Sequence, residues 1–254
     1  MAKIVRCKST LLLLEKIISN RKFSVTHGGK MSRYKTLHNG LPQGAVLSPM
    51  LFNIYTADMN DTVSRKFIYA DDVALVTQAT SFEEIESVLN VDVARLKNFF
   101  QKWYLKLNPN KSVTCIFHLN NREANRTLSI VADDQKITTE GTPKYLGVRL
   151  DRTLTFRQHL ESVKDKIKTR NNIIAKLAGP SWGCRENVIR TSALALVYNV
   201  AKYCVPVWAR SAHCKKVDVQ LNETLRIISG TVRSRLAAST VQYSPSRPTE
   251  TSPD

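Results

Sequence analysis

Two adjacent carboxylates, Asp71 and Asp72, stand between two short apolar runs, and this pattern limits the local fold more than any other feature of the chain. Residues 67–70 and 73–76 are apolar or aromatic, which predicts a strand, a tight turn and a second strand. Such a hairpin presents carboxylate oxygens at its tip. Mg²⁺ is usually held by one or two carboxylates together with substrate phosphates. The pattern therefore predicts half of a site for metal-dependent phosphate chemistry.

A plain turn is the alternative for any such pair, because Asp tolerates turn geometry and can hydrogen-bond its own backbone. The chain contains a second pair, Asp133 and Asp134, between the segments 128–131 and 135–137. We interpret this second pair as a plain turn. For the first pair, the decision depends on the segments that accompany it.

A glycine-rich loop lies upstream of the first pair. Gly40, Pro42 and Gly44 predict a tight loop that runs directly into a helix, with Ser48 as N-cap and Pro49 at its first position. The apolar residues that follow fall on one helical face: Leu51, Ile54, Tyr55 and Met59. A glycine loop at a helix N-terminus lets backbone approach a nucleotide or template strand and offers N–H groups to phosphate. On its own, such a loop is a weak indication.

A long amphipathic helix is predicted downstream of the pair. Ser81 and Glu84 form a capping box at its start. The apolar residues at helical spacing are Phe82, Ile85, Leu89, Val93, Leu96, Phe99, Phe100 and Trp103. We expect this stripe to be core rather than a surface on which bases stack. The helix should end near Leu107, because residues 108–110 form a turn.

The order of these elements resembles the palm of a reverse transcriptase, an RNA-directed DNA polymerase of the non-LTR, LINE-type and Jockey-like mobile elements. Four motifs carry the resemblance, namely Gly40-Leu41-Pro42-Gln43-Gly44, Tyr69-Ala70-Asp71-Asp72, Leu107-Asn108-Pro109-Asn110-Lys111 and Lys144-Tyr145-Leu146-Gly147. Three later segments look like the region after the palm, namely 175–179, 203–208 and 225–230. The resemblance extends from about residue 11 to about residue 233.

The resemblance implies RNA-templated DNA synthesis with an RNA template, a DNA primer, deoxynucleoside triphosphates and two Mg²⁺ or Mn²⁺ ions in a complete site. The implied metal ligands and catalytic carboxylates are Asp71 and Asp72, of which Asp71 is the stronger assignment. Lys111 would approach the triphosphate, although a solvated turn lysine is an equal alternative. The implied template and nucleotide contacts are Gly40, Pro42, Gln43, Gly44 and Tyr69. The implied primer grip is Tyr145, Leu146 and Gly147.

One feature departs from the family pattern. The family's first acidic motif supplies the other metal-binding Asp and should precede the glycine loop, but the only carboxylate upstream of Gly40 is Glu15. We therefore expect the isolated fragment to be inactive unless an upstream or separate segment supplies that Asp. A non-catalytic nucleic-acid-binding remnant of a retrotransposon is the alternative function. An untranslated relic without function is a third possibility.

The chain is strongly basic. It contains 38 Lys and Arg against 21 Asp and Glu, a formal net charge of +17, which favours polyanionic partners over a membrane surface. The basic cluster after the palm consists of Arg149, Arg152, Arg157, Lys164, Lys166, Lys168 and Arg170. A predicted helix carries most of it, with an apolar side made of Phe156, Leu160, Val163, Ile167 and Ile174. This segment is where a thumb would hold a duplex, although a solvated basic face is the simpler explanation for any single lysine.

The predicted fold is α+β, with a partial palm of antiparallel sheet and packed helices before an α-helical thumb-like domain. The expected segments are a divergent leader (1–10), the partial palm (11–151), the thumb-like region (156–230) and a disordered tail (236–254). Five cysteines without close pairs indicate reduced thiols in the nucleus or cytoplasm, not a secreted protein. Cys204, His213 and Cys214 lack zinc-site spacing. No segment is long enough to span a membrane.

Overall fold

The computed structural model describes residues 7–38, 40–59, 61–179 and 183–231. It contains both helices and strands, as predicted, whereas the palm and thumb assignments stay predictions. The chain forms two compact units: Met1–Val113 with Leu128–Thr138, and Thr114–Thr127 with Thr139–Asp254. Residues 139–151, predicted as the end of the palm, thus belong to the second unit. The predicted tail and most of the predicted leader lie outside the described residues.

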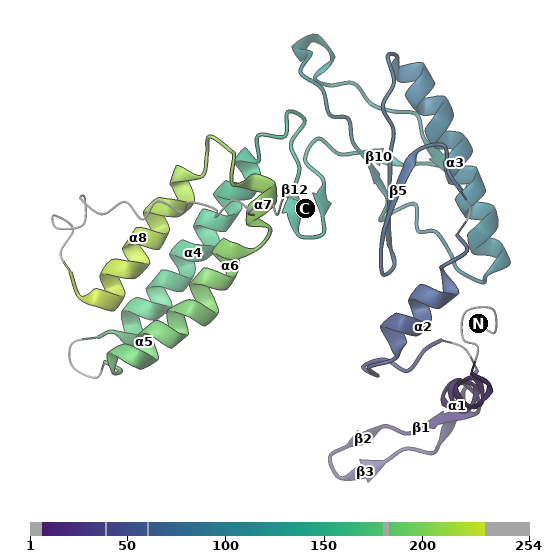
Figure 1. Ribbon diagram of the computed structural model, residues 1–254, viewed down its shortest axis with the longest axis horizontal. Helices are drawn as coiled ribbons and strands as arrows, with labels where there is room; N and C mark the ends of the chain where they lie inside the picture. Colours follow the sequence, from purple (N-terminus) through teal and green to yellow (C-terminus); the bar gives the residue numbers. More distant parts are fainter. Residues whose placement is uncertain (1–6, 39, 60, 180–182, 232–254) are drawn as a thin grey trace, which may run out of the picture. The chain divides into compact units, whose positions relative to one another are not determined.

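The first unit begins with a helix and small hairpins and continues into a hairpin supported by a long helix (Figure 1). Its elements are α1 (Lys8–Ile18), β1 (Arg21–Phe23), β2 (Thr26–His27), β3 (Lys30–Met31), β4 (Lys35–Leu37), α2 (Ser48–Tyr55), β5 (Arg65–Tyr69), β6 (Asp72–Val76), α3 (Phe82–Lys102), β8 (Val131–Ala132) and β9 (Gln135–Lys136). Two further strands stand where the chain passes between units, β7 (Val113–Thr114) and β10 (Thr138–Thr139).

The predicted hairpin around the acidic pair is confirmed. β5 and β6 pair antiparallel from Arg65 opposite Val76 to Tyr69 opposite Asp72. One face of the hairpin packs on α3, where Met59, Leu96 and Phe99 are buried. The partly buried residues around them are Val73, Leu75, Phe100 and Trp103. The C-terminal part of the predicted stripe, from Leu96 to Trp103, is therefore core.

The predicted start of α3 is confirmed and its predicted end is wrong. The Ser81 side chain caps the helix by accepting the Glu84 N–H at 3.2 Å. The helix ends at Lys102, five residues before Leu107. Tyr104 turns into the left-handed region (φ 53°) and the Leu105 N–H donates back to the Phe100 carbonyl at 2.8 Å. This hydrogen bond and the left-handed Tyr104 are typical of a Schellman C-cap in which tyrosine takes the place of the usual glycine. The spacing of the apolar residues did not predict this cap.

The prediction of Ser48 as the N-cap of α2 is also wrong. Leu47 occupies the N-cap position and Ser48 is the first helical residue, so Pro49 stands at the second helical position and not at the predicted first. The Ser48 hydroxyl donates to the Pro42 carbonyl at 2.6 Å, so this hydroxyl closes the glycine loop instead of accepting a helix N–H. The helix ends at Tyr55, and Met59 is buried beyond its end.

A buried carboxylate on α3 anchors the start of the hairpin. Asp92 is 0% exposed, and its oxygens accept the Val63 N–H at 2.9 Å, the Ser64 N–H at 2.7 Å and the Ser64 hydroxyl at 2.5 Å. Burial alone would raise the pKa of Asp92, but these hydrogen bonds outweigh it and the pKa is lowered. Asp92 therefore holds the residues just before β5 as a charged group.

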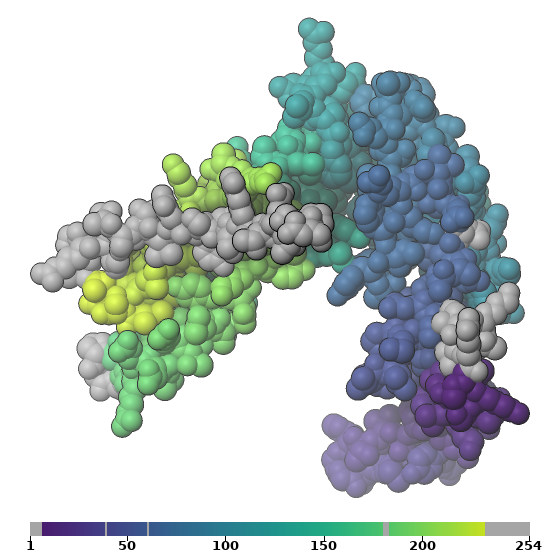
Figure 2. Space-filling view, viewed as in Figure 1, coloured from purple at the N-terminus to yellow at the C-terminus, as the bar shows by residue number. Residues whose placement is uncertain are grey.

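The second unit combines a small hairpin with a helical bundle. Its elements are a 3₁₀ turn (Asn121–Glu123), β11 (Lys144–Tyr145), β12 (Val148–Arg149), α4 (Arg157–Leu177), α5 (Glu186–Ala193), a π-helical segment (Leu194–Tyr198), α6 (Asn199–Lys202), α7 (Val205–Trp208) and α8 (Lys215–Ser229). The core residues of α4 are Leu160, Val163, Ile167 and Ile174, as its predicted apolar side required. The green and yellow helices form one continuous packed body in Figure 2.

A polar contact inside this bundle fixes the pairing of α4 with α8. The Thr224 hydroxyl donates to Asn171 Oδ1 at 2.7 Å, and the Asn171 amide donates to the Gln220 carbonyl at 3.0 Å. Both side chains are buried, so each needs its partner. Among the described residues, no helix is both long and apolar enough to cross a membrane.

We predict that Asp92→Ala lowers the free energy of unfolding by about 1.5–3 kcal/mol, because hydrogen bonds to a charged group are lost and buried donors remain unpaired. Urea unfolding followed by circular dichroism measures the change. Asp58→Ala is the control, since Asp58 is exposed in the same unit and its loss should cost less than about 0.5 kcal/mol. Equal effects of the two substitutions would contradict the anchoring role of Asp92.

Candidate functional site

The acidic pair lies at the tip of the β5–β6 hairpin. Tyr69 and Asp72 form the last pair of the ladder, and Ala70 (φ 52°) and Asp71 form the two-residue turn. Both carboxylates are exposed, and within the described ranges neither is in an ion pair, so their oxygens are available to a cation. The site residues fit a metal ion that also takes ligands from substrate phosphates. Their role as metal ligands stays a prediction.

The protein alone does not form a closed metal cage in the part of the chain that the structure describes. No group of three or more His, Cys, Asp or Glu side chains there is arranged to hold a metal ion. The Cys214 thiol instead donates to the backbone carbonyls of Trp208 and Ala209, at 3.2 and 3.3 Å. The second acidic pair is a turn, as predicted, because Asp133 and Asp134 both take positive φ between β8 and β9.

The predicted glycine loop before α2 is confirmed as a tight loop. Gly40 and Gly44 take φ angles of 85° and 81°, which favour glycine. The Pro42 carbonyl accepts the Ala45 N–H at 3.3 Å in addition to the Ser48 hydroxyl. The Gln43 side chain is exposed, as a template or nucleotide contact requires. That contact is a prediction.

The loop and the hairpin share the first unit through the helices that follow them. The Tyr55 ring of α2 meets the Trp103 ring of α3 edge to face, with centroids 5.3 Å apart, and the Tyr55 hydroxyl donates to the Trp103 carbonyl. Lys111 is in the same unit and is exposed. It lies in a turn, where its backbone N–H donates to the Asn108 carbonyl at 3.2 Å. Both interpretations of Lys111 therefore remain open.

The predicted primer-grip residues lie in the second unit and form a hairpin rather than one strand. Lys144 pairs with Arg149 and Tyr145 with Val148, and Leu146 (φ 43°) and Gly147 (φ 85°) make the turn. Two consecutive residues with positive φ are typical of a two-residue hairpin turn. The sequence pattern did not distinguish this hairpin from a single strand, because each of its strands has only two residues.

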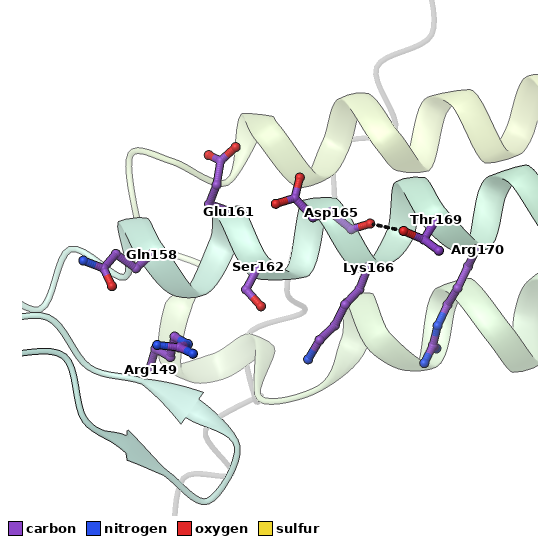
Figure 3. A pocket seen from close by; sticks show the side chains of 8 residues that line it. All are labelled: Arg149, Gln158, Glu161, Ser162, Asp165, Lys166, Thr169 and Arg170. Atoms are coloured by element: carbon purple, nitrogen blue, oxygen red, sulfur yellow. Dashed lines mark hydrogen bonds between the residues drawn. The ribbon is translucent and has the colours of Figure 1, made fainter.

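Cationic side chains follow one side of α4. Arg149 of β12, with Lys166 and Arg170 of α4, lines a hollow of about 620 Å³. Figure 3 shows that Lys166 and Arg170 point to the side of α4 on which Arg149 lies. Glu161 and Asp165 also line the hollow but point away from that side. We call Arg149, Lys166 and Arg170 the cationic row; its two helical members are one turn apart, about 6 Å along the axis.

Two other members of the predicted basic cluster, Lys164 and Arg152, make contacts within the protein itself. Lys164 lies 2.5 Å from the Glu161 carboxylate, which also binds Lys216 of α8. Hydrogen bonds from Lys164 and Lys216 lower the pKa of Glu161 to about 2. Arg152 donates to the His118 carbonyl at 2.9 Å. The charges of Lys164 and Arg152 are therefore less available to a ligand than that of Lys166, which has no such contact among the described residues. Arg170 of the cationic row also has an internal contact, because its guanidinium donates to the Leu196 carbonyl.

A buried histidine joins the hairpin to α4, and the sequence analysis missed it. His159 is 5% exposed; its Nδ1 accepts the Arg149 N–H at 3.4 Å, and its ring centroid lies 6.5 Å from that of Trp208. Its Nε2 is buried without a hydrogen-bond partner among the described residues. Burial, followed by the charges of Lys166 and Arg149, lowers the pKa of His159. A lone histidine in an amphipathic helix gave no recognisable signal.

Comparison with known proteins decides the family. Residues 2–150 match the family model described as reverse transcriptase (RNA-dependent DNA polymerase). The chain belongs to the reverse transcriptase family. The predicted resemblance is thereby confirmed for this reverse transcriptase chain, and the match includes the loop, the acidic hairpin and the Leu146-Gly147 turn.

The relatives of this reverse transcriptase come from mobile elements. It is 29% identical to the RNA-directed DNA polymerase from mobile element jockey of Drosophila melanogaster, over 86% of this chain and 25% of the relative. It is 30% identical to the corresponding Drosophila funebris protein, over 90% of the chain and 26% of the relative. It is 25% identical to the probable RNA-directed DNA polymerase from transposon X-element of D. melanogaster, over 86% and 25%. No solved structure matches.

This reverse transcriptase chain therefore spans about a quarter of the length of these relatives. Its candidate site residues are divided between the two compact units. The loop, the acidic hairpin and Lys111 belong to the first unit, whereas the primer-grip hairpin and the cationic row belong to the second.

We predict that the second unit loses stability as the pH falls below about 6.5, the ordinary pKa of histidine. The folded chain disfavours protonation of His159, so the unfolded chain takes up the proton first and gains stability relative to the folded state. The urea midpoint, followed by circular dichroism, should fall between pH 7.5 and pH 5.5. His159→Gln should weaken this dependence, whereas the exposed control His27→Gln should behave like the parent chain. An unchanged pH dependence in His159→Gln would contradict the prediction.

Proposed function

We propose that this chain provides part of the active site of an RNA-directed DNA polymerase of a Jockey-like retrotransposon. The observation that carries this proposal is the exposed Asp71 and Asp72 pair at the tip of a hairpin, inside the segment that matches the reverse transcriptase family. An RNA template, a DNA primer and deoxynucleoside triphosphates are the proposed substrates. The relatives are named as RNA-directed DNA polymerases, which supports this substrate class.

In the proposed reaction, the primer 3′-hydroxyl oxygen attacks the α-phosphorus of the nucleotide, pyrophosphate leaves and the hydroxyl proton is released. Asp71, with Asp72 beside it, would hold divalent Mg²⁺ or Mn²⁺. Such ions stabilise charge on the attacking and leaving oxygens when they are bound. The loop 40–44 would offer its backbone to the template and nucleotide, and Lys111 would neutralise phosphate charge.

The proposed active site also needs a carboxylate from a further segment. Two adjacent carboxylates on one hairpin tip are half of a two-metal site, and the only carboxylate upstream of the glycine loop is Glu15 in α1. We therefore propose that an upstream or separate segment must bring the second Asp before primer extension occurs. By itself, this chain would bind the primer and template without extending the primer.

The second candidate function is nucleic-acid binding without catalysis, and the cationic row favours it. Three basic side chains converge on one hollow of the second unit, and the whole chain carries a net charge of +17. Cations that line one hollow can contact several phosphates of one strand, and binding then releases counterions. Phosphate contacts of this kind do not read sequence.

The catalytic proposal predicts that this chain alone does not extend a primer on an RNA template. A longer polypeptide of the same element, with its Asp-bearing upstream strand, should do so in Mg²⁺ or Mn²⁺. Asp71→Asn should lower that extension rate by at least about 100-fold, because a metal ligand is lost. The matched control is Asp134→Asn, which changes an exposed Asp of the other acidic turn and should leave the rate unchanged. Full activity of Asp71→Asn would refute the assignment.

The binding proposal predicts a steep dependence of affinity on salt. Lys166→Ala should reduce the slope of log K against log salt by about 1, because one phosphate contact is lost. Lys168→Ala is the control, since Lys168 is exposed on the same helix but two residues away and so on another face. Fluorescence anisotropy with an RNA–DNA hybrid measures both. If the two substitutions act equally, the binding depends on overall charge and not on the cationic row.

A further inference from the structure

A tyrosine from the helical bundle holds the turn of the β11–β12 hairpin. The Tyr203 hydroxyl donates to the Leu146 carbonyl at 2.5 Å, across 57 positions of the sequence. Leu146 and Gly147 are the two turn residues and both have positive φ, so the turn leaves its outward-facing carbonyl without a partner in the β11–β12 ladder. Tyr203 supplies that partner.

The ring of Tyr203 also lies against the turn. A Cβ atom at position 147 would come within 3.1 Å of Tyr203 Cε1 and 3.2 Å of its hydroxyl oxygen, closer than nine in ten real Cβ contacts. Glycine at this position is therefore needed for the close approach of the ring as well as for the φ of 85°. The described glycines with positive φ other than Gly147 have open space around the Cβ direction.

Tyr203 itself is fixed by the bundle core. Its carbonyl accepts the indole N–H of Trp208 at 2.9 Å, and Trp208 is buried among the core side chains of α4, α5 and α8. Cys204, the next residue, takes a left-handed conformation (φ 53°), which turns the chain sharply between α6 and α7. Tyr203 is 51% exposed, so its ring is not enclosed by core side chains. The position of the ring therefore depends on its contacts with the hairpin turn.

The other end of the hairpin is fixed separately. The Leu150 N–H donates to the Pro143 carbonyl at 2.9 Å, and the Arg149 N–H donates to His159 of α4. The hairpin is therefore attached to the bundle at its base through His159 and at its turn through Tyr203. Among the side-chain contacts of the described residues, that of Tyr203 acts directly on Leu146 and Gly147.

We propose that Tyr203 is a positioning residue for the primer terminus, because it sets the conformation of the Leu146-Gly147 turn. This inference rests on the proposed function together with the predicted primer grip of Tyr145, Leu146 and Gly147. Tyr203 contacts the turn and not the reacting atoms. Loss of its hydroxyl releases the Leu146 carbonyl and lets the turn move while the bundle stays folded.

The test compares two RNA–DNA hybrids of equal length, one with a recessed DNA 3′ end and one blunt, and measures the Kd of each with this chain by fluorescence anisotropy. The parent chain should prefer the recessed end. Tyr203→Phe should reduce that preference by about fivefold, the value of one hydrogen bond, leave the blunt Kd unchanged and lower the thermal midpoint by no more than about 2–8 °C. A 2-aminopurine at the primer 3′ position should show a smaller fluorescence change with Tyr203→Phe than with the parent chain.

Two further variants control the result. Tyr198→Phe removes the hydroxyl of a half-buried tyrosine in the π-helical segment and should keep the full preference. Gly147→Ala displaces the Tyr203 ring and should lose the preference, and adding Tyr203→Phe to it should cause little further loss.

The outcomes separate this inference from the proposed function. An unchanged preference in Tyr203→Phe, or an equal loss of affinity for both hybrids, overturns the positioning role and leaves the proposed function standing. A parent chain that binds both hybrids equally well refutes the primer-grip assignment and this inference with it. A parent chain that binds neither hybrid at low salt refutes nucleic-acid binding altogether.

Discussion

The hydrogen bonds to the Asp92 carboxylate are the constraint on which the acidic hairpin depends. A two-stranded hairpin is at best marginally stable by itself, and in the described part of the chain β5 and β6 pair only with each other. Packing on α3 supplies the missing stabilisation, and Asp92 fixes where the chain enters β5 through Val63 and Ser64. In the described part of the chain, the outer edges of β5 and β6 are unpaired, and an unpaired strand edge is a template for a further strand.

The basic residues of the second unit differ in the contacts that they make. Lys164 and Arg152 are used in contacts within the protein, one with Glu161 and the other with a backbone carbonyl. Lys166 of the cationic row instead points into a hollow on one side of α4, whereas Arg170, which lines the same hollow, also donates to the Leu196 carbonyl. Net charge predicts a polyanionic partner, but only the contacts of each side chain show which charges remain available to it.

Local sequence predicted the elements whose causes are local. The acidic hairpin, the Asp133-Asp134 turn and the Ser81 cap follow from turn and capping chemistry within a few residues. The predictions for the end of α3 and the N-cap of α2 were both wrong, and the two errors have similar causes. In each, a hydrogen bond from Leu105 or Ser48 reached back to a carbonyl that the residue types alone do not identify.

The sequence by itself determined the family, the acidic hairpin and the apolar stripes of the two long helices, because motifs and periodicity are written in neighbouring residues. Only the tertiary structure decided that Asp92 anchors the hairpin, that His159 lies buried against Arg149 and that Tyr203 holds the Leu146-Gly147 turn. Asp92 interrupts the apolar stripe of α3, and this position was a visible sign in the sequence that the carboxylate has a structural role. The contact of His159 has no sequence motif. The hydrogen bond of Tyr203 joins residues 57 positions apart, so it exists only after the helices have packed.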